Sequence, residues 1–263
     1  MTGIHVIGGT SEVLELPTTQ KIGPHDLMDA LRRGVDDFAA MPSHAIFLCL
    51  IYPIVGFFLA GLTLGYNVLP LFFPLAAGFA LIGPVAAVGL YELSRRREDG
   101  LDAHWTHAFD VWRSPSLGAI AALGLVLMGL FLAWLVTAQV IYQSLFGVMP
   151  PSSLSQFATD VLTTPAGWSL IVWGNLAGLL FAICVLAISA VSFPLLIDRD
   201  IGAAAALATS VRVVWENPMT MALWGLIVAA LLVIGSLPAF MGLAVVMPIL
   251  GHATWHLYRK ALT

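Results

Sequence analysis

The sequence predicts an all-α fold: a polytopic bundle of six transmembrane helices, with short amphipathic interfacial helices preceding several of the spans. Of the 263 residues, 59% are apolar and only 10% are charged, whereas soluble domains carry about 25% charged residues. The apolar residues form continuous runs near or above the ~20 residues that a helix needs to cross a bilayer. Barrel strands would alternate in polarity instead. The basic residues are confined to a few segments, and this distribution predicts which side of the bundle faces the cytoplasm.

Six apolar runs are the predicted spans. They cover residues 44–64, 69–93, 117–146, 167–197, 219–236 and 238–258. The last two are separated only around Ser236 to Pro238, which predicts a tight helical hairpin. Five spans, or six with one re-entrant, are the alternatives. Residues 1–23 are expected to be a flexible tail, and residues 24–263 a single membrane domain.

The lysines and arginines predict the orientation of this bundle. All eleven lie in the N-terminal tail, after the second span, after the fourth span or at the C-terminal end. Cytoplasmic loops carry such an excess, so both termini are expected in the cytoplasm. Arg95, Arg96 and Arg97 are interpreted as topology determinants, because Glu98 and Asp99 beside them weaken any attraction for nucleic acid. The first forty residues lack a signal-peptide pattern, so the first span is expected to direct membrane insertion.

Four amphipathic stretches precede predicted spans, and each ends at a proline. These prolines are Pro42, Pro115, Pro165 and Pro218. Apolar residues at helical spacing predict helices that lie in the membrane interface, and proline suits the first position of the helix that follows. Residues 26–40 and 201–216 are therefore expected in the membrane plane, with Leu31, Phe38, Val211 and Trp215 facing apolar surroundings. Internal duplication and local convergence both explain the pattern.

Polar residues in the spans are the candidate site residues, because such groups are costly in lipid. Five lie at the cytoplasmic ends of spans: His44, Glu92, Asp198, His252 and His256. They are interpreted as a polar latch in which Glu92 and Asp198 bind a His or Arg of another helix. The latch is a proton or ligand site only if it opens onto a cavity. Gln139 and Asn175 are expected to join helices by hydrogen bonds.

The function classes can be narrowed from what the sequence lacks. No nucleophile elbow, phosphate loop, dinucleotide fingerprint or zinc-protease motif occurs, so an enzyme is the least favoured class, and neither a cofactor nor a metal is expected. The net charge of −4 does not suit a nucleic-acid partner. Two functions stay open. One is a non-catalytic accessory, scaffold or assembly protein of a membrane complex; the other is a small transporter or channel for a small or amphipathic solute. Membrane lipids are expected partners, and an oligomer is compatible with either function.

Several long segments carry a resemblance to a known family. They include "RRGVDDFAAMPSHAIFL", "PLAAGFALIGPVAAVGLYELSRRRE", "AVSFPLLIDRDIG" and "NPMTMALWGLIVAALLVIGSLPAFMGLAVVMPILGHATWHLYR". The chain resembles an uncharacterised family of predicted bacterial integral membrane proteins, which implies a multi-pass protein of the bacterial inner membrane with no assigned activity.

Some relatives in that family are labelled as cytochrome c oxidase subunits. A catalytic oxidase subunit needs sets of intramembrane haem and copper ligands. Only His44, His252 and His256 lie in the predicted spans, and Cys49 is far in sequence from Cys184. The catalytic form of the label is therefore not supported, while an accessory or assembly role beside a respiratory complex is compatible with the sequence.

Overall fold

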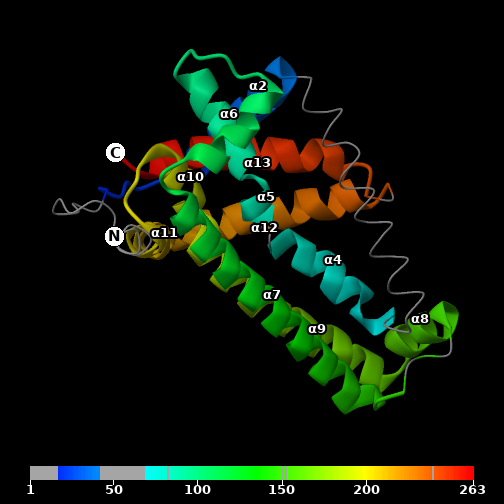
Figure 1. Ribbon diagram of the computed structural model, residues 1–263. Helices are drawn as coiled ribbons and strands as arrows, with labels where there is room; N and C mark the ends of the chain where they lie inside the picture. Colours follow the sequence, from blue (N-terminus) through cyan, green and yellow to red (C-terminus); the bar gives the residue numbers. More distant parts are fainter. Residues whose placement is uncertain (1–16, 42–68, 82, 150, 152, 239) are drawn as a thin grey trace. The chain divides into compact units, whose positions relative to one another are not determined.

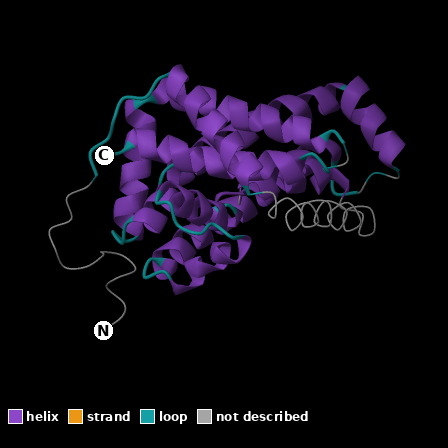
Figure 2. Cartoon of the chain, turned by 90° about the horizontal axis from the view of Figure 1, so that it is seen from above, coloured by secondary structure: helices purple, strands orange, loops and turns teal. Residues whose placement is uncertain are grey.

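The computed structural model describes residues 17–41, 69–81, 83–149, 151, 153–238 and 240–263. Helices make up nearly all of this part, and its only β pairing is the isolated bridge between Thr19 and Leu262 (Figure 2). The predicted all-α fold class is confirmed. The first predicted span, the N-terminal part of the predicted tail and His44 lie outside the described residues.

The helices appear in the following order along the chain (Figure 1). They are α2 (Pro24–Ala40), η1 (Leu69–Leu71), α4 (Phe72–Leu81), α5 (Gly83–Ala86), α6 (Val88–Glu98), η2 (Trp105–Arg113), α7 (Leu117–Phe146), α8 (Leu154–Thr163), α9 (Pro165–Ser189), α10 (Ser192–Asp198), α11 (Ala203–Glu216), α12 (Pro218–Ser236) and α13 (Leu243–Ala261). They form two compact units. Unit 1 comprises Met1–Pro53, Gly83–Leu125 and Leu186–Thr263, and unit 2 comprises Ile54–Ile82 and Val126–Val185.

Three of the described helical segments are long and apolar enough to cross a membrane. They are Leu117–Phe146, Pro165–Asp198 and Pro218–Ser236, which correspond to the third, fourth and fifth predicted spans. The second predicted span is divided into η1, α4, α5 and α6. A turn at Ala87 separates α5 from α6. Six spans thus remain a prediction.

Helix α13, which covers most of the sixth predicted span, lies in the core of unit 1. Most of its residues are buried, and α2, α6 and α12 pack against it (Figure 1). Helix α2 approaches α13 closely at Gly34, where a Cβ atom would lie 2.7 Å from the carbonyl oxygen of Ile249 and 2.7 Å from the amide nitrogen of Ala253. Only a glycine fits at this contact without displacing backbone.

The predicted hairpin between the last two spans corresponds to α12 and α13. Their ends meet at two glycines, because a Cβ atom on Gly242 would lie 2.7 Å from the carbonyl oxygen of Gly235. At the other end of α12, the side chain of Asn217 accepts a hydrogen bond from the amide of Ile22 at 2.9 Å and donates to the carbonyl of Gln20 at 3.1 Å. Asn217 therefore fastens the segment before α2 to unit 1.

In unit 2, α4, α8 and the unit 2 parts of α7 and α9 pack around Trp134. Its indole N–H donates to the carbonyl of Pro74 at 2.9 Å, and its ring lies 5.8 Å from that of Phe181, centroid to centroid. A Cβ atom on Gly178 would lie 3.3 Å from the same indole. At the start of α9, the hydroxyl of Thr164 accepts a hydrogen bond from the amide of Gly167 at 3.0 Å, as expected for a helix cap.

The amphipathic stretches predicted before spans form helices where the structure describes them. On α11 the inward face is Ala206, Thr209, Ser210 and Val213. Its outward face exposes large apolar side chains beside Arg212: Val211 is 40% exposed and Trp215 is 84% exposed. Helix α2 is oriented differently, because its inward face packs on α13 and both Leu31 and Phe38 are half-buried.

Candidate functional site

One group of polar residues in unit 1 surrounds Asp37, near the end of α2. Its helix turns one face toward α13, formed by Leu27, Ala30, Gly34 and Asp37. The first three are apolar or small and allow close packing. The fourth places a carboxylate in the same interface, where it is only 4% exposed. A carboxylate can be buried at such a position only if hydrogen bonds replace the water that it loses.

Two helices, α6 and α13, supply those hydrogen bonds. On α6, the hydroxyl of Ser94 donates to Oδ2 of Asp37 at 2.6 Å, and Arg97 donates to Oδ1. On α13, Nε2 of His256 lies 2.9 Å from Oδ2 of Asp37, and Nδ1 of His252 lies 2.7 Å from the hydroxyl oxygen of Ser94. We call these five residues the Asp37 cluster.

The donor and acceptor roles in the Asp37 cluster follow from its chemistry. An ionised carboxylate only accepts hydrogen bonds, so His256 must carry a proton on Nε2. The single proton of the Ser94 hydroxyl is used toward Asp37, so Ser94 accepts from a protonated Nδ1 of His252. A directed chain of hydrogen bonds therefore runs from His252 through Ser94 to Asp37.

The surroundings of Asp37 favour its ionised form. Burial by itself raises the pKa of the Asp37 carboxyl group, but hydrogen bonds from His256 and Ser94 and the electrostatic influence of the two histidines outweigh it. The net result is that the pKa of Asp37 lies below its ordinary value. The cluster is therefore an ionic contact between α2, α6 and α13.

A second group of polar contacts joins α6, α10 and α13. Glu98 accepts hydrogen bonds from the indole N–H of Trp255 at 2.9 Å and from Nε of Arg259 at 3.2 Å. Asp198 accepts one from the hydroxyl of Tyr258 at 2.5 Å, and Nη1 of Arg259 lies 3.5 Å from the same carboxylate. Arg259 thus links the ends of α6 and α10.

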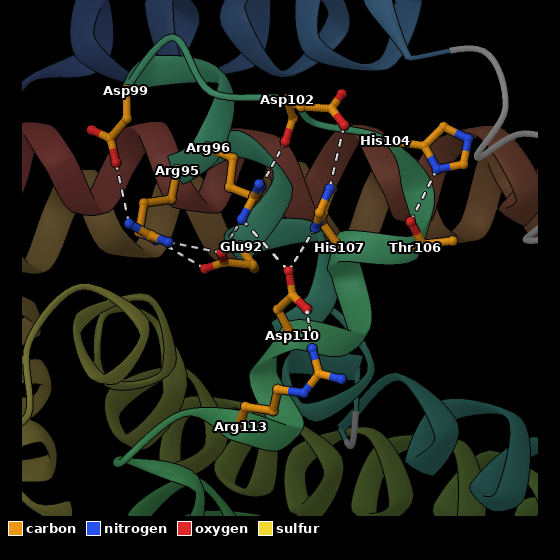
Figure 3. Close-up of polar contacts among 10 residues, drawn as sticks. All are labelled: Glu92, Arg95, Arg96, Asp99, Asp102, His104, Thr106, His107, Asp110 and Arg113. Atoms are coloured by element: carbon orange, nitrogen blue, oxygen red, sulfur yellow. Dashed lines mark hydrogen bonds and ion pairs between the residues drawn. The ribbon is translucent and has the colours of Figure 1, made fainter.

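A third group connects α6 with η2 (Figure 3). Glu92, which is 6% exposed, pairs with Arg95 at 2.8 Å, and Arg96 lies 3.5 Å from Asp110 of η2. Asp110 also contacts Nδ1 of His107 at 2.6 Å. The pKa of Asp110 lies below its ordinary value, mainly because of the hydrogen bond with His107. The charges of the neighbouring arginines lower it further, and partial desolvation opposes these effects.

The residues of the predicted latch are divided between these groups. His252 and His256 join the Asp37 cluster, and Asp198 contacts Tyr258 and Arg259 of another helix. The partners of Glu92 within the described part of the chain are Arg95 and Arg96 of its own helix, the latter at 3.9 Å.

The arginines interpreted as topology determinants all contact carboxylates of the protein. Arg95 pairs with Glu92, Arg96 with Asp110 and Arg97 with Asp37. Arg96 and Arg97 therefore hold α6 to η2 and α2, whereas Arg95 pairs within its own helix.

Gln139 and Asn175 were predicted to join helices by hydrogen bonds, but the described residues contain no such bond between helices for either side chain. The side-chain amide of Asn175 donates to the carbonyl of Ile171 one turn earlier in α9, at 2.7 Å. Gln139 is half-buried on α7. Asn175 also lines a cavity of about 350 Å³ inside unit 2, whereas Gln139 is not among the lining residues.

Sequence reasoning missed Asp37, Ser94 and the role of Arg97 in the cluster. The signal that could have identified Asp37 is its spacing: it follows Gly34 and Ala30 on the face that contains the small residues. A carboxylate on the face of closest helix approach predicts a buried partner on the facing helix.

The chemical capacity of the Asp37 cluster is limited by burial. Ser94 and His252 form a hydroxyl–imidazole pair of the type that activates a nucleophile, but both residues have 0% exposed surface. Their hydrogen bonds are used within the cluster, and a substrate cannot reach them in this conformation. Across the described residues, no group of three or more His, Cys, Asp or Glu is arranged to hold a metal ion.

Comparison with known proteins identifies one family. Residues 72–198 match the family described as "Predicted integral membrane protein (DUF2189)". The resemblance to an uncharacterised family of integral membrane proteins, predicted from the sequence, is thereby confirmed. Searches of curated proteins and of solved structures find no match.

Proposed function

We propose that this integral membrane protein, whose residues 72–198 carry the domain of the matched family, is a non-catalytic accessory, scaffold or assembly protein of a membrane complex, such as a respiratory complex. It acts through surfaces that bind lipid and a protein partner. In this proposal it is a multi-pass protein of the bacterial inner membrane with six spans and with both termini in the cytoplasm.

The observation that supports this proposal most strongly is the use made of the buried polar residues. In the Asp37 cluster, each charged or hydroxyl group is bound to a group on a neighbouring helix. Four of its residues, Asp37, Ser94, His252 and His256, are buried (0 to 7% exposed). Buried hydrogen-bond networks between helices make a fold more rigid. A rigid polar core beneath apolar outer faces suits a protein that holds other proteins in place.

The exposed apolar faces of the helices support the part of the proposal in which the protein binds a membrane-protein partner. Large apolar side chains are exposed along α9 and α12, including Leu180 at 66% and Leu226 at 66%. In a membrane protein such faces contact lipid or another membrane protein. On α11, the 84% exposed Trp215 suits the interface between lipid tails and headgroups, where tryptophan is enriched.

The proposal is tested by isolating the protein at its native expression level in a mild detergent and identifying what accompanies it. We expect a membrane complex to copurify in a fixed ratio, and cross-links from it to reach α9, α11 or α12. The same preparation is also reconstituted in liposomes, where solute flux is measured to test the transporter alternative. Isolation without a partner, together with solute flux in liposomes that hold this protein alone, would contradict the accessory role.

The second candidate function is a small transporter or channel. The cavity of unit 2 favours it, because the cavity lies beside two long apolar helices and is lined in part by the amide of Asn175. Prolines within predicted spans, such as Pro74 and Pro84, also favour it, since broken helices expose backbone groups that can line a pathway. The liposome experiment above separates the two functions.

The proposed orientation makes its own prediction. Single cysteines placed near residues 97 and 206 and at the C-terminus should react with a membrane-impermeant reagent only from the cytoplasmic side. Cysteines near residues 67 and 155 should react only from the opposite side. The physical reason is the confinement of lysine and arginine to four segments. Cytoplasmic labelling at residue 155 would exclude both six spans and this orientation.

A further inference from the structure

The cavity of unit 2 has the composition of a site for a neutral apolar molecule. Its volume is about 350 Å³, and the residues that line it come from η1, α4, α7, α8 and α9. None of them is charged at neutral pH, and four are aromatic: Phe73, Trp134, Tyr142 and Phe157. An apolar cavity of roughly 150 Å³ is already dry and accepts a benzene ring. This larger cavity therefore has room for a longer hydrocarbon.

The space beside Gly174 indicates where such a molecule would lie. Gly174 lines the cavity, and a Cβ atom built on it meets no other atom within 4 Å. One turn further along α9, a Cβ atom on Gly178 would instead lie 3.3 Å from the ring of Trp134. The helix surface is thus packed at Gly178 and open at Gly174, between the aromatic residues and Asn175.

The surroundings of the cavity indicate which hydrocarbon molecules are available to enter it. Helix α7 and the segment Pro165–Asp198 are long and apolar enough to cross a membrane, so the medium beside the cavity is lipid. The absence of charge among its lining residues leaves no partner for a phosphate or ammonium group. Only the uncharged part of a lipid suits the interior.

We propose that the cavity of unit 2 binds one acyl chain of a membrane phospholipid, whose headgroup stays outside the cavity. The chain packs against Trp134, Tyr142 and Phe157 and occupies the space beside Gly174. Asn175, at an exposed position on the cavity lining, has a second amide N–H that can donate to an ester carbonyl oxygen of that lipid. The site is independent of whether the protein serves as an accessory protein or as a transporter.

The test uses native mass spectrometry of the purified full-length protein and three glycine variants. The wild type should retain one phospholipid per chain. Gly174→Leu should lower the retained fraction by about tenfold or more, because its side chain fills the space that the acyl chain needs. Gly174→Ala adds only a Cβ atom to open space and should retain the lipid.

Gly129→Leu is the matched control. It is the same substitution on an apolar helix, at a glycine whose Cβ would also meet no atom within 4 Å, but Gly129 does not line the cavity. It should retain the lipid as the wild type does. Equal retention by Gly174→Leu and Gly129→Leu would overturn the proposal, as would a wild type that carries no lipid or that carries a molecule other than a phospholipid.

A second measurement covers the case in which Gly174→Leu does not fold. A phospholipid with a photoreactive diazirine on its acyl chain is incubated with the wild-type protein and irradiated. The label is expected in the α7 and α9 peptides that contain Trp134, Tyr142 and Gly174. Labels spread evenly over the exposed faces of α9 and α12 would identify the lipid as a general surface contact and overturn the proposal.

Discussion

Replacing Asp37 with asparagine should lower the free energy of unfolding by about 1–3 kcal/mol, the range found when buried hydrogen-bonding groups lose their partner. The substitution keeps the size of the side chain but removes its charge. Arg97 and the protonated Nε2 of His256 would then face a neutral amide. The measurement is unfolding in mixed detergent micelles, followed by circular dichroism.

The neighbouring carboxylate provides a matched control, because Asp36 is exposed on the same helix. Asp36→Asn should change the free energy of unfolding by no more than about 0.5 kcal/mol. Acid titration adds a second comparison. Since the pKa of Asp37 is lowered in the fold, its contribution is present above the unfolded value of about 3.9 and is lost as the pH falls below it. The Asp37→Asn variant should lack this loss, and equal effects of the two substitutions would refute the role given to Asp37.

Replacing Gly34 with leucine should lower the free energy of unfolding by about 3 kcal/mol or more, because the new side chain has no space. Even its Cβ atom would lie 2.7 Å from backbone atoms of Ile249 and Ala253. The backbone cannot rotate away as a side chain could, so α2 must separate from α13. That separation would also disturb the Asp37 cluster one turn later on α2.

Gly129→Leu serves as the control here too, because its position on α7 is open and exposed. In a helix, leucine is more favourable than glycine by somewhat under 1 kcal/mol, so this variant should be as stable as the wild type or slightly more stable. If Gly34→Leu were equally well tolerated, the close packing of α2 on α13 would be absent in the membrane.

The helical class and three of the apolar helices could be predicted from composition and run length alone. Runs such as 117–146 contain no charged residue, so no tertiary context is needed to recognise them. The amphipathic stretches were equally accessible, because apolar residues at helical spacing and the prolines Pro165 and Pro218 mark where α9 and α12 begin.

Whether lipid or protein surrounds each helix was harder to predict from the sequence. Helix α13 has an apolar first half, but it carries His252, His256 and Arg259 in its second half, and these residues contact α2, α6 and α10. An apolar run has the same appearance whether lipid or protein surrounds it. Only the pairing of its polar residues with those of other helices, which depends on the fold, separates the two cases.

The candidate site could be predicted only in part, because its local spacing can be read from the sequence but its long-range contacts depend on the fold. The i, i+4 spacing of His252 and His256 predicts that both lie on one face of a helix. The sequence does not contain the information that Asp37, more than 200 residues earlier, lies opposite them. Glu92 illustrates the reverse case. Its arginine partners are three and four residues away on its own helix, a local pairing that helical spacing alone predicts.

The central claim is that Asp37 couples α2 to α13 through His256, and a double-mutant cycle tests it most directly. The free energy of unfolding is measured for the wild type, Asp37→Asn, His256→Gln and the double variant. We predict a coupling energy of about 1–3 kcal/mol between Asp37 and His256, as for residues in one buried network. In a control cycle with Asp36→Asn in place of Asp37→Asn, the coupling energy should be below about 0.5 kcal/mol. A coupling near zero between Asp37 and His256, equal to that of the control cycle, would contradict the claim.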